Sequence, residues 1–242
     1  MPRWDIAETR RLIELRHGSE QIRRARHCLR SVTERLRHAR YHFQEARNLL
    51  KSHIDDRLDT KNIYTLTWPT APEEWSTLDN CMMKVEANLI ACAQGIHSIA
   101  DTLAHIVYFA LGLDRSLGPL KERDVNISKV INVLKQTPAY SEVERAIASL
   151  LEDSSFALVT IMTNHAKHRG FPESRLSIDP PDQEAPYAME FGAFAYNKIE
   201  HSEHEIEKVI APAYKAADRA VIDTGNALNL VLSRECAPHL FH

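Results

Sequence analysis

Two long segments of this chain carry apolar residues at alternating steps of three and four. The first segment spans residues 22–50 and the second spans residues 75–113. This spacing keeps one face of a helix apolar over many turns, and it is typical of long helices that pack at shallow angles in bundles and coiled coils. The two stripes are Ile22, Ala25, Leu29, Val32, Leu36, Ala39, Phe43, Ala46 and Leu50, and then Trp75, Leu78, Met82, Val85, Leu89, Cys92, Ile96, Ile99, Leu103, Ile106, Ala110 and Leu113.

Glycine and proline residues mark where these helices end. Gly18 is expected to end a short helix over residues 4–17, because glycine readily adopts the left-handed conformation that closes many helices. The linker over residues 59–72 contains helix-stopping prolines, and it is long enough for the second long helix to run back antiparallel to the first. The second helix is expected to end at Gly112, Gly118 and Pro119.

The next part of the chain is predicted to form a short helix over residues 127–135 and then a longer one. Ser141 to Glu144 has the pattern of a capping box, in which a hydroxyl and a carboxylate satisfy free backbone N–H groups. One helix is therefore expected to run from Ser141 to a stop at Gly170. The spacing of apolar residues predicts a final long helix over residues 206–231.

Residues 171–197 have a different character from the rest of the chain. Prolines exclude helix from much of this segment, and residues 175–178 and 187–194 alternate in the manner of strands, which predicts a two-stranded hairpin. The predicted fold class is all-α, an up-down helical bundle of about five main long helices with a small β-hairpin insertion over approximately 171–197. We expect these elements to form a single domain over residues 1–242.

Positive charge is concentrated in the first quarter of the chain. Residues 1–54 hold 13 Lys and Arg residues against 6 Asp and Glu, a net charge of +7, whereas the whole chain has a net charge of -3. Twelve of these 13 basic residues are Arg, whose planar side chain suits phosphate or carboxylate partners. The alternative, which we favour here, is a solvated helix face that pairs with acidic helices of the same chain.

Cysteine spacing and hydropathy restrict the class of protein. Cys28, Cys81, Cys92 and Cys236 form no C-x-x-C pair, so they are interpreted as reduced, mostly buried thiols, with Cys92 in the core. The apolar stretch over residues 103–113 is too short to span a bilayer, and the N-terminus lacks the apolar segment of a signal peptide. We therefore expect a cytoplasmic protein with no membrane association.

The most informative motif is the polar cluster over residues 164–170, with the sequence Asn-His-Ala-Lys-His-Arg-Gly. It ends the predicted helix directly after the apolar run 156–162. Helical periodicity predicts one core-facing stripe formed by Leu158, Ile161, His165 and His168. Asn164 and His168 are four residues apart and are expected to be able to touch. Polar side chains at the end of a buried helix face either form hydrogen bonds within the protein or belong to a functional site.

The order of these elements, together with Asn164, Lys167, His168 and Arg169, resembles proteins of the HEPN superfamily over residues 75–235. The resemblance implies an all-helical, usually homodimeric protein of RNA processing, toxin–antitoxin or phage-defence systems. It also implies RNA or nucleotide as ligand and metal-independent ribonuclease activity, with those four residues as catalytic groups and no metal or cofactor. Other members are inactive binding modules. Active members carry Arg immediately before the polar residue, where this chain has Thr163.

The chemistry of such a site is direct. Histidine can take the proton of an RNA 2′-hydroxyl, while Lys167 or Arg169 stabilises negative charge on the phosphate. In the alternative, Asn164 and His168 cap the helix and bond the hairpin backbone, and the two cations complement the negative end of the helix dipole. A second hypothesis of function is a non-enzymatic helical module that binds a protein partner or itself through the long helices.

Three weaker patterns complete the sequence-based hypotheses. The pairs His165/His168 and His201/His204 suggest a shared metal ion, but we interpret residues 201–207 as the solvated, polar start of the final helix. Residues 37–42, Arg-His-Ala-Arg-Tyr-His, match the Arg-four-residues-His spacing, which arises easily in an Arg-rich helix. We also expect a symmetric dimer, because the apolar stripes are longer than one helical hairpin needs.

Overall fold

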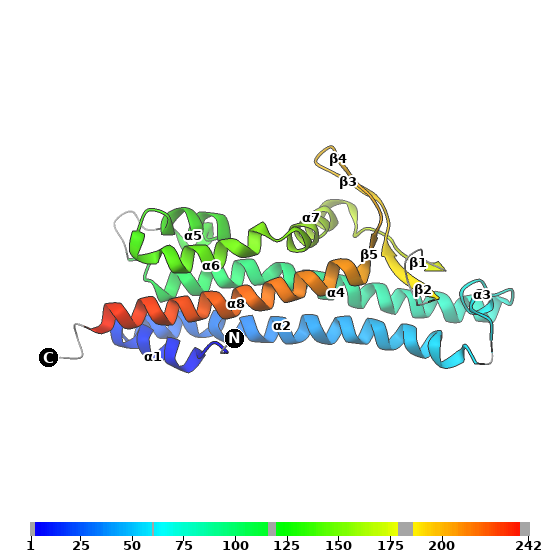
Figure 1. Ribbon diagram of the computed structural model, residues 1–242, viewed down its shortest axis with the longest axis horizontal. Coiled ribbons are helices and arrows are strands. Elements are labelled where there is room, and N and C mark those ends of the chain that lie inside the picture. The colour runs from blue at the N-terminus through cyan, green and yellow to red at the C-terminus, as the bar shows by residue number, and fades with distance from the viewer. Residues whose placement is uncertain (1–2, 60, 116–119, 179–185, 238–242) are drawn as a thin grey trace. The chain divides into compact units, whose positions relative to one another are not determined.

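The computed structural model describes residues 3–59, 61–115, 120–178 and 186–237. The described chain is mostly helical, at 75% helix with 8 α-helices, and it carries a small antiparallel strand insertion (Figure 1). The helices are α1 (Ile6–His17), α2 (Ser19–His53), α3 (Ile63–Thr67), α4 (Pro72–Ala110), α5 (Ile127–Leu134), α6 (Ser141–Glu152), α7 (Ser154–Arg169) and α8 (Ile206–Cys236). The strands are β1 (Ser174–Ile178), β2 (Tyr187–Phe191), β3 (Phe194–Tyr196), β4 (Ile199–His201) and β5 (His204–Glu205).

The chain divides into two compact units. Unit 1 consists of Met1–Leu36, Ser98–Ala157 and Lys215–His242, and unit 2 consists of Arg37–His97 and Leu158–Tyr214. Helices α2, α4, α7 and α8 each contribute residues to both units. A single domain over residues 1–242 stays a prediction.

Helices α2 and α4 are antiparallel within unit 2. His42 Nδ1 lies 2.9 Å from Asn88 Oδ1, and further along α2 the Cys81 thiol donates to the Leu49 carbonyl oxygen at 3.7 Å. Rising residue numbers on α2 therefore meet falling numbers on α4. In unit 1 the same polarity holds, since Gln21 Nε2 donates to the Phe109 carbonyl oxygen at 2.9 Å and Arg35 Nη1 donates to Ser98 Oγ at 2.7 Å.

The two apolar stripes form the core, as predicted. All residues of the first stripe are buried except Phe43, which is half-buried. In the second stripe, Trp75 is exposed and Met82 is half-buried, and the other residues are buried. Gly18, with φ 85°, ends α1 as expected, and Gly112, with φ 65°, follows the end of α4. Gly118 and Pro119 lie outside the described residues.

The predicted single helix from Ser141 to Gly170 is wrong, because the chain leaves helical geometry at Asp153. There ψ is 123°, and the Asp153 carboxylate accepts a hydrogen bond from the backbone N–H of Phe156 at 2.8 Å. This is the contact of a helix N-cap, so α7 begins as a separate helix. The predicted capping box is also absent, since Ser141 is already helical and α6 has no side-chain cap.

The β insertion contains the predicted hairpin and more. Strands β1 and β2 pair antiparallel, with Ser174 opposite Phe191. The predicted strand over 187–194 instead ends at Phe191, and β5 adds a third strand beside β2. A second hairpin, β3–β4, turns at Asn197 and Lys198, whose φ values of 50° and 66° match a tight two-residue turn. Figure 1 shows this hairpin extending away from the three-stranded sheet.

Candidate functional site

The four residues of the predicted site lie in the last two turns of α7, within unit 2. Asn164 is half-buried, and Lys167, His168 and Arg169 are exposed. Gly170, with φ 89°, ends the helix in the left-handed conformation, as the sequence predicts. We refer to Asn164, Lys167, His168 and Arg169 together as the α7 terminus.

The predicted core-facing stripe of α7 is wrong by one residue. Leu158 and Ile161 are only half-buried, and His168 is exposed. A one-residue step turns a helix by about 100°, so the true core face is rotated toward the following residues. The buried side chains of α7 are Phe156, Val159, Met162 and Thr163.

His165, rather than His168, performs the structural role at this helix end. Its Nδ1 lies 2.8 Å from the Gly170 carbonyl oxygen. Its ring packs edge-on against Phe194 of β3, with centroids 5.3 Å apart, and lies 6.4 Å from Tyr196. Phe194 in turn stacks on His201 of β4 at 4.8 Å. The β3–β4 hairpin is therefore held to α7 through His165.

Contacts within the α7 terminus leave His168 available. Lys167 Nζ donates to Asn164 Oδ1 at 2.8 Å, so the predicted pairing of Asn164 with His168 is not the contact that forms. The Arg169 guanidinium donates to the Ala195 carbonyl oxygen at 3.4 Å, a long hydrogen bond. His168 has no hydrogen bond, ion pair or ring contact to any residue that the structure describes.

The α7 terminus is electropositive. Neither Lys167 nor Arg169 has a carboxylate within ion-pair distance among the described residues, whereas nearby Arg175 is paired with Glu203 at 3.0 Å. Cations in the last turn of a helix are stabilised by the negative end of the helix dipole. Two cations and an imidazole are therefore exposed to solvent at this helix end.

The two histidine pairs do not converge on one point. His201 stacks on Phe194, and His204 lies in β5, where it pairs across to Phe191. In the described ranges, no group of three or more His, Cys, Asp or Glu side chains is placed to hold a metal ion. The interpretation of residues 201–207 as the start of the final helix is wrong for residues 201–205, because β4 and β5 precede α8, which begins at Ile206.

The structure also places the cysteines and the Arg-rich segment 37–42. Cys92 is fully buried and its burial raises its pKa to about 12, so the prediction of a core thiol is confirmed. Cys28 is half-buried and the two remaining cysteines are buried, all without a disulfide. In the Arg-rich segment 37–42, His42 is hydrogen-bonded to Asn88, while Arg37 and Arg40 are exposed.

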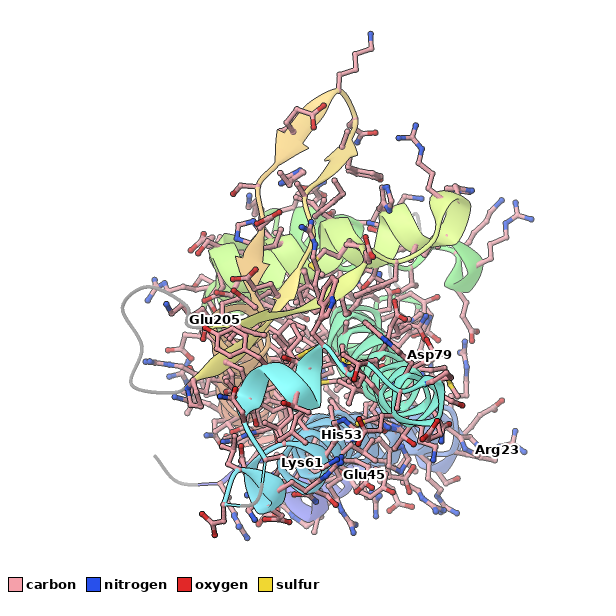
Figure 2. The ribbon with its side chains drawn as sticks, turned by 90° about the vertical axis from the view of Figure 1, so that its right-hand side faces the viewer. Arg23, Glu45, His53, Lys61, Asp79 and Glu205 are labelled. Atoms are coloured by element: carbon pink, nitrogen blue, oxygen red, sulfur yellow. The ribbon has the colours of Figure 1, made fainter. Side chains whose placement is uncertain are left out.

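Sequence reasoning missed a cavity of about 520 Å³ within unit 2. Its wall is formed by the second half of α2, the short 3-10 helix Asp55–Arg57, α4, β2, β5 and the start of α8. Glu205, labelled in Figure 2, lies on this wall beside the strands. The apolar part of the wall comprises Phe43, Ala46, Leu50, Val85, Leu89, Ala188, Met189 and Ile206. Its volume falls in the range of about 300–1,000 Å³ that is usual for small-ligand sites.

The rim of the cavity is polar and nearly neutral in charge. Arg47 pairs with Glu207 at 3.1 Å across the rim. The Tyr187 hydroxyl donates to Asp55 Oδ1 at 2.9 Å, and burial, with the help of this bond, raises the pKa of that hydroxyl. Gln44 Nε2 donates to Asn48 Oδ1 at 3.0 Å, which leaves amide groups of both residues facing solvent. The α2 part of the rim is visible in the sequence, but its strand partners are not.

The α7 terminus and this cavity are separate features of unit 2. In both views α4 lies between α7 and α2 (Figures 1 and 2). No residue of the α7 terminus lines the cavity. The two features therefore require separate tests.

Comparison with known proteins gives no relative: the chain matches no family model, no curated protein and no solved structure. The resemblance to the HEPN superfamily stays a prediction. Among the described helices none is long and apolar enough on its own to cross a membrane, although the bent pair of residues 138–152 and 154–169 meets that test by length and composition together.

Proposed function

We propose that this chain is a HEPN-like protein that binds RNA at the α7 terminus and cleaves it without a metal ion. One observation supports this above the others. His168 is exposed and free of internal contacts in the described chain, beside two cations that lack carboxylate partners. A histidine with a purely structural role would be directed into the protein, as His165 is.

The proposed reaction uses the chemistry of the three exposed side chains. The His168 imidazole takes the proton of a 2′-hydroxyl, and the 2′ oxygen attacks the adjacent phosphorus. The bond from phosphorus to the 5′ oxygen breaks, and the leaving oxygen takes a proton from solvent water. The products are a 2′,3′-cyclic phosphate and a 5′-hydroxyl end. Lys167, held by Asn164, and Arg169 stabilise the negative charge on the phosphate.

Thr163 stands where active superfamily members carry Arg, and it cannot replace that charge. Its side chain is buried, and its hydroxyl has no hydrogen-bond partner among the residues that the structure describes. In the proposal Arg169 or Lys167 supplies the cation instead. A two-fold dimer would bring two copies of the α7 terminus together, so we propose a homodimer as the active form.

Binding tests the proposal directly. A fluorescein-labelled 2′-O-methyl RNA cannot be cleaved, so its anisotropy reports binding alone. Lys167→Ala/Arg169→Ala should weaken binding at least ~10-fold and lower the slope of log affinity against log salt by about 1.4, because two phosphate contacts are lost. Arg10→Ala/Lys215→Ala removes two exposed cations elsewhere and should leave binding unchanged. Equal affinities for all three proteins would exclude RNA binding at the α7 terminus.

A second candidate function is a protein-interaction or self-association module. One specific observation favours it: Trp68 and Trp75 are 73% and 40% exposed and contact each other edge-on, with centroids 5.7 Å apart. Met83, on α4, is also 55% exposed. Exposed aromatic clusters of this kind mark association surfaces. Light scattering should give a monomer mass for Trp68→Ala/Trp75→Ala and a dimer mass for wild type if these residues form the interface.

We also propose that the long helices form one up-down bundle. The antiparallel contacts of α2 with α4 in each unit, and the helices shared between the units, support this arrangement. Cooperative unfolding in a single transition, measured by circular dichroism in urea, is expected for one bundle. Two separate transitions would contradict it.

A further inference from the structure

One face of α2 in unit 2 presents a row of basic and amide side chains. Each is exposed, and steps of three and four residues place them on one side of the helix. We call this row the α2 track. It consists of Arg37, Arg40, Gln44, Arg47, Asn48 and Lys51.

Charge is distributed unevenly along the α2 track. Arg37 and Arg40 have no carboxylate within ion-pair distance among the residues described, so their charge is uncompensated. Arg47 is paired with Glu207 at 3.1 Å, and Lys51 is paired with Asp56 at 2.6 Å. The track is therefore positive at its start and balanced at its end.

The balanced end of the α2 track is also the rim of the cavity. Gln44, Arg47, Asn48 and Lys51 all line it, above an apolar interior. One helical turn separates Arg40 from Gln44, so an extended ligand can contact the positive start of the track and enter the cavity at the same time. Such a ligand combines an anionic chain with flat, largely apolar groups.

We infer that the cavity takes one unstacked base of a single-stranded RNA, whose phosphates lie on Arg37 and Arg40. Single-stranded nucleic acid has the required combination, since its binding sites pair a basic groove for the backbone with apolar and aromatic surfaces for bases. Phe43 and Tyr187 supply aromatic surface in the wall. The choice of RNA as the ligand rests on the proposed function, but the site is distinct from the α7 terminus.

The polar groups of the rim suit a base better than they suit a phosphate. Gln44 and Asn48 each keep part of an amide free, and an amide can both donate to and accept from the edge of a base. The carboxylates of Asp55, Glu205 and Glu207 lie on the same wall and disfavour a bound anion there. The uncharged base is thus placed in the cavity and the phosphates outside it.

Three variants separate the contribution of the base from that of the backbone. Asn48→Trp, at an exposed position, places an indole in the mouth of the cavity. It should weaken binding of a labelled 2′-O-methyl RNA about 10-fold and leave binding of the same strand with abasic sites unchanged. Gln44→Trp, also at an exposed position, should give the same result and guards against a folding defect in one variant. Arg37→Ala/Arg40→Ala should weaken binding of both strands equally and lower the salt slope by about 1.4.

The outcomes distinguish this inference from the proposed function. Wild-type affinity in both tryptophan variants would overturn the base pocket, and wild-type affinity in Arg37→Ala/Arg40→Ala would overturn the proposal that the α2 track binds phosphates.

If Lys167→Ala/Arg169→Ala alone weakens binding, the α7 terminus holds the RNA and the inference is wrong. If the α2 variants weaken binding and that pair does not, the inference stands and the proposed location of the function is wrong. Displacement of the RNA by poly-glutamate, lost in Asn48→Trp, would identify an acidic peptide site instead and overturn the inference.

Discussion

His165 and His168 lie one turn apart on α7 and have opposite surroundings. His165 is bonded to the Gly170 carbonyl oxygen and packed on Phe194, whereas His168 is exposed and without a described partner. His165→Ala should therefore lower the free energy of unfolding by about 1–3 kcal/mol. His168→Ala should change it by less than ~0.5 kcal/mol. Urea unfolding followed by circular dichroism measures both, and a reversed order would assign the structural role to His168.

Gly225 is required by the packing of Trp4 in unit 1. A Cβ atom at Gly225 would overlap the Trp4 ring, and Trp4 is itself fixed by a hydrogen bond from its Nε1 to Thr9 Oγ1 at 2.7 Å. Gly225→Ala should cost about 1–3 kcal/mol through overpacking, despite the better helix propensity of alanine.

Gly95→Ala is a matched control for that change, because a Cβ there would lie 3.2 Å from Ala39 Cβ and needs only a small adjustment. Its unfolding free energy should stay within about 1 kcal/mol of wild type. A Gly225→Ala protein as stable as wild type would show that Trp4 does not occupy this position.

His17 makes the stability of unit 1 depend on pH. Its Nε2 lies 3.2 Å from the Ala110 carbonyl oxygen, and its burial lowers its pKa from the usual value of about 6.5. The unfolded chain therefore takes up the proton more readily than the folded chain. The resulting stability is fully present above about pH 6.5 and is lost as pH falls through the lowered pKa of the folded state.

His17→Gln keeps a donor for the Ala110 carbonyl oxygen and removes this titration. The fall in melting temperature between about pH 7.5 and 5.5 should be smaller in the variant than in wild type. An identical fall in both proteins would mean that His17 does not contribute to the pH dependence.

At the scale of elements, apolar periodicity predicts α2 and α4 well because it extends over many turns. Their stripes are buried almost throughout, and the helix ends differ from the predicted ones by only a few residues. The same reasoning joins α6 and α7, since both are helical and Asp153 is a single residue between them. Asp and Ser are preferred N-cap residues, so the Asp-Ser-Ser sequence at residues 153–155 is compatible with a helix start. The apolar pattern continues on both sides of it, and for this reason the break is not predicted.

Asp153 should matter to α7 as its N-cap. Asp153→Ala removes the acceptor for the Phe156 N–H and should cost about 1 kcal/mol, whereas Asp153→Asn keeps an acceptor and should cost less than half of that. Amide hydrogen exchange in the first turn of α7 measures the effect locally. Unchanged protection in Asp153→Ala would show that the helix start does not depend on this side chain.

The shortest strands could not be predicted from the sequence. The β1–β2 hairpin is predictable from alternation, but β4 and β5 contain only three and two residues, too few for any period to show. Their Glu- and His-rich sequence looks like a helix start. The tight turn at Asn197 and Lys198 lacks the Gly that usually marks such a turn.

At the scale of the whole molecule, the residue types of a candidate site are easier to predict from the sequence than the positions of those residues in the fold. The motif residues could be proposed from residue types, but the one-residue error in the buried face of α7 placed His168 on the core side, whereas it is exposed. The cavity could not be predicted at all, because its wall joins α2 to strands more than 130 residues later in the chain. The dimer stays a prediction, and its original argument is weakened, since the long stripes are buried within the chain.

The central claim is that His168 at the α7 terminus acts on RNA. The most direct measurement is the rate at which purified protein converts an end-labelled RNA, in excess EDTA, to fragments with 2′,3′-cyclic phosphate ends. Wild-type protein should cleave, and His168→Ala should be slowed at least ~100-fold with an unchanged melting temperature. His27→Ala, at an exposed histidine of α2 in unit 1, is the control and should cleave like wild type. Intact RNA with wild-type protein, or equal rates with His168→Ala, would contradict the account.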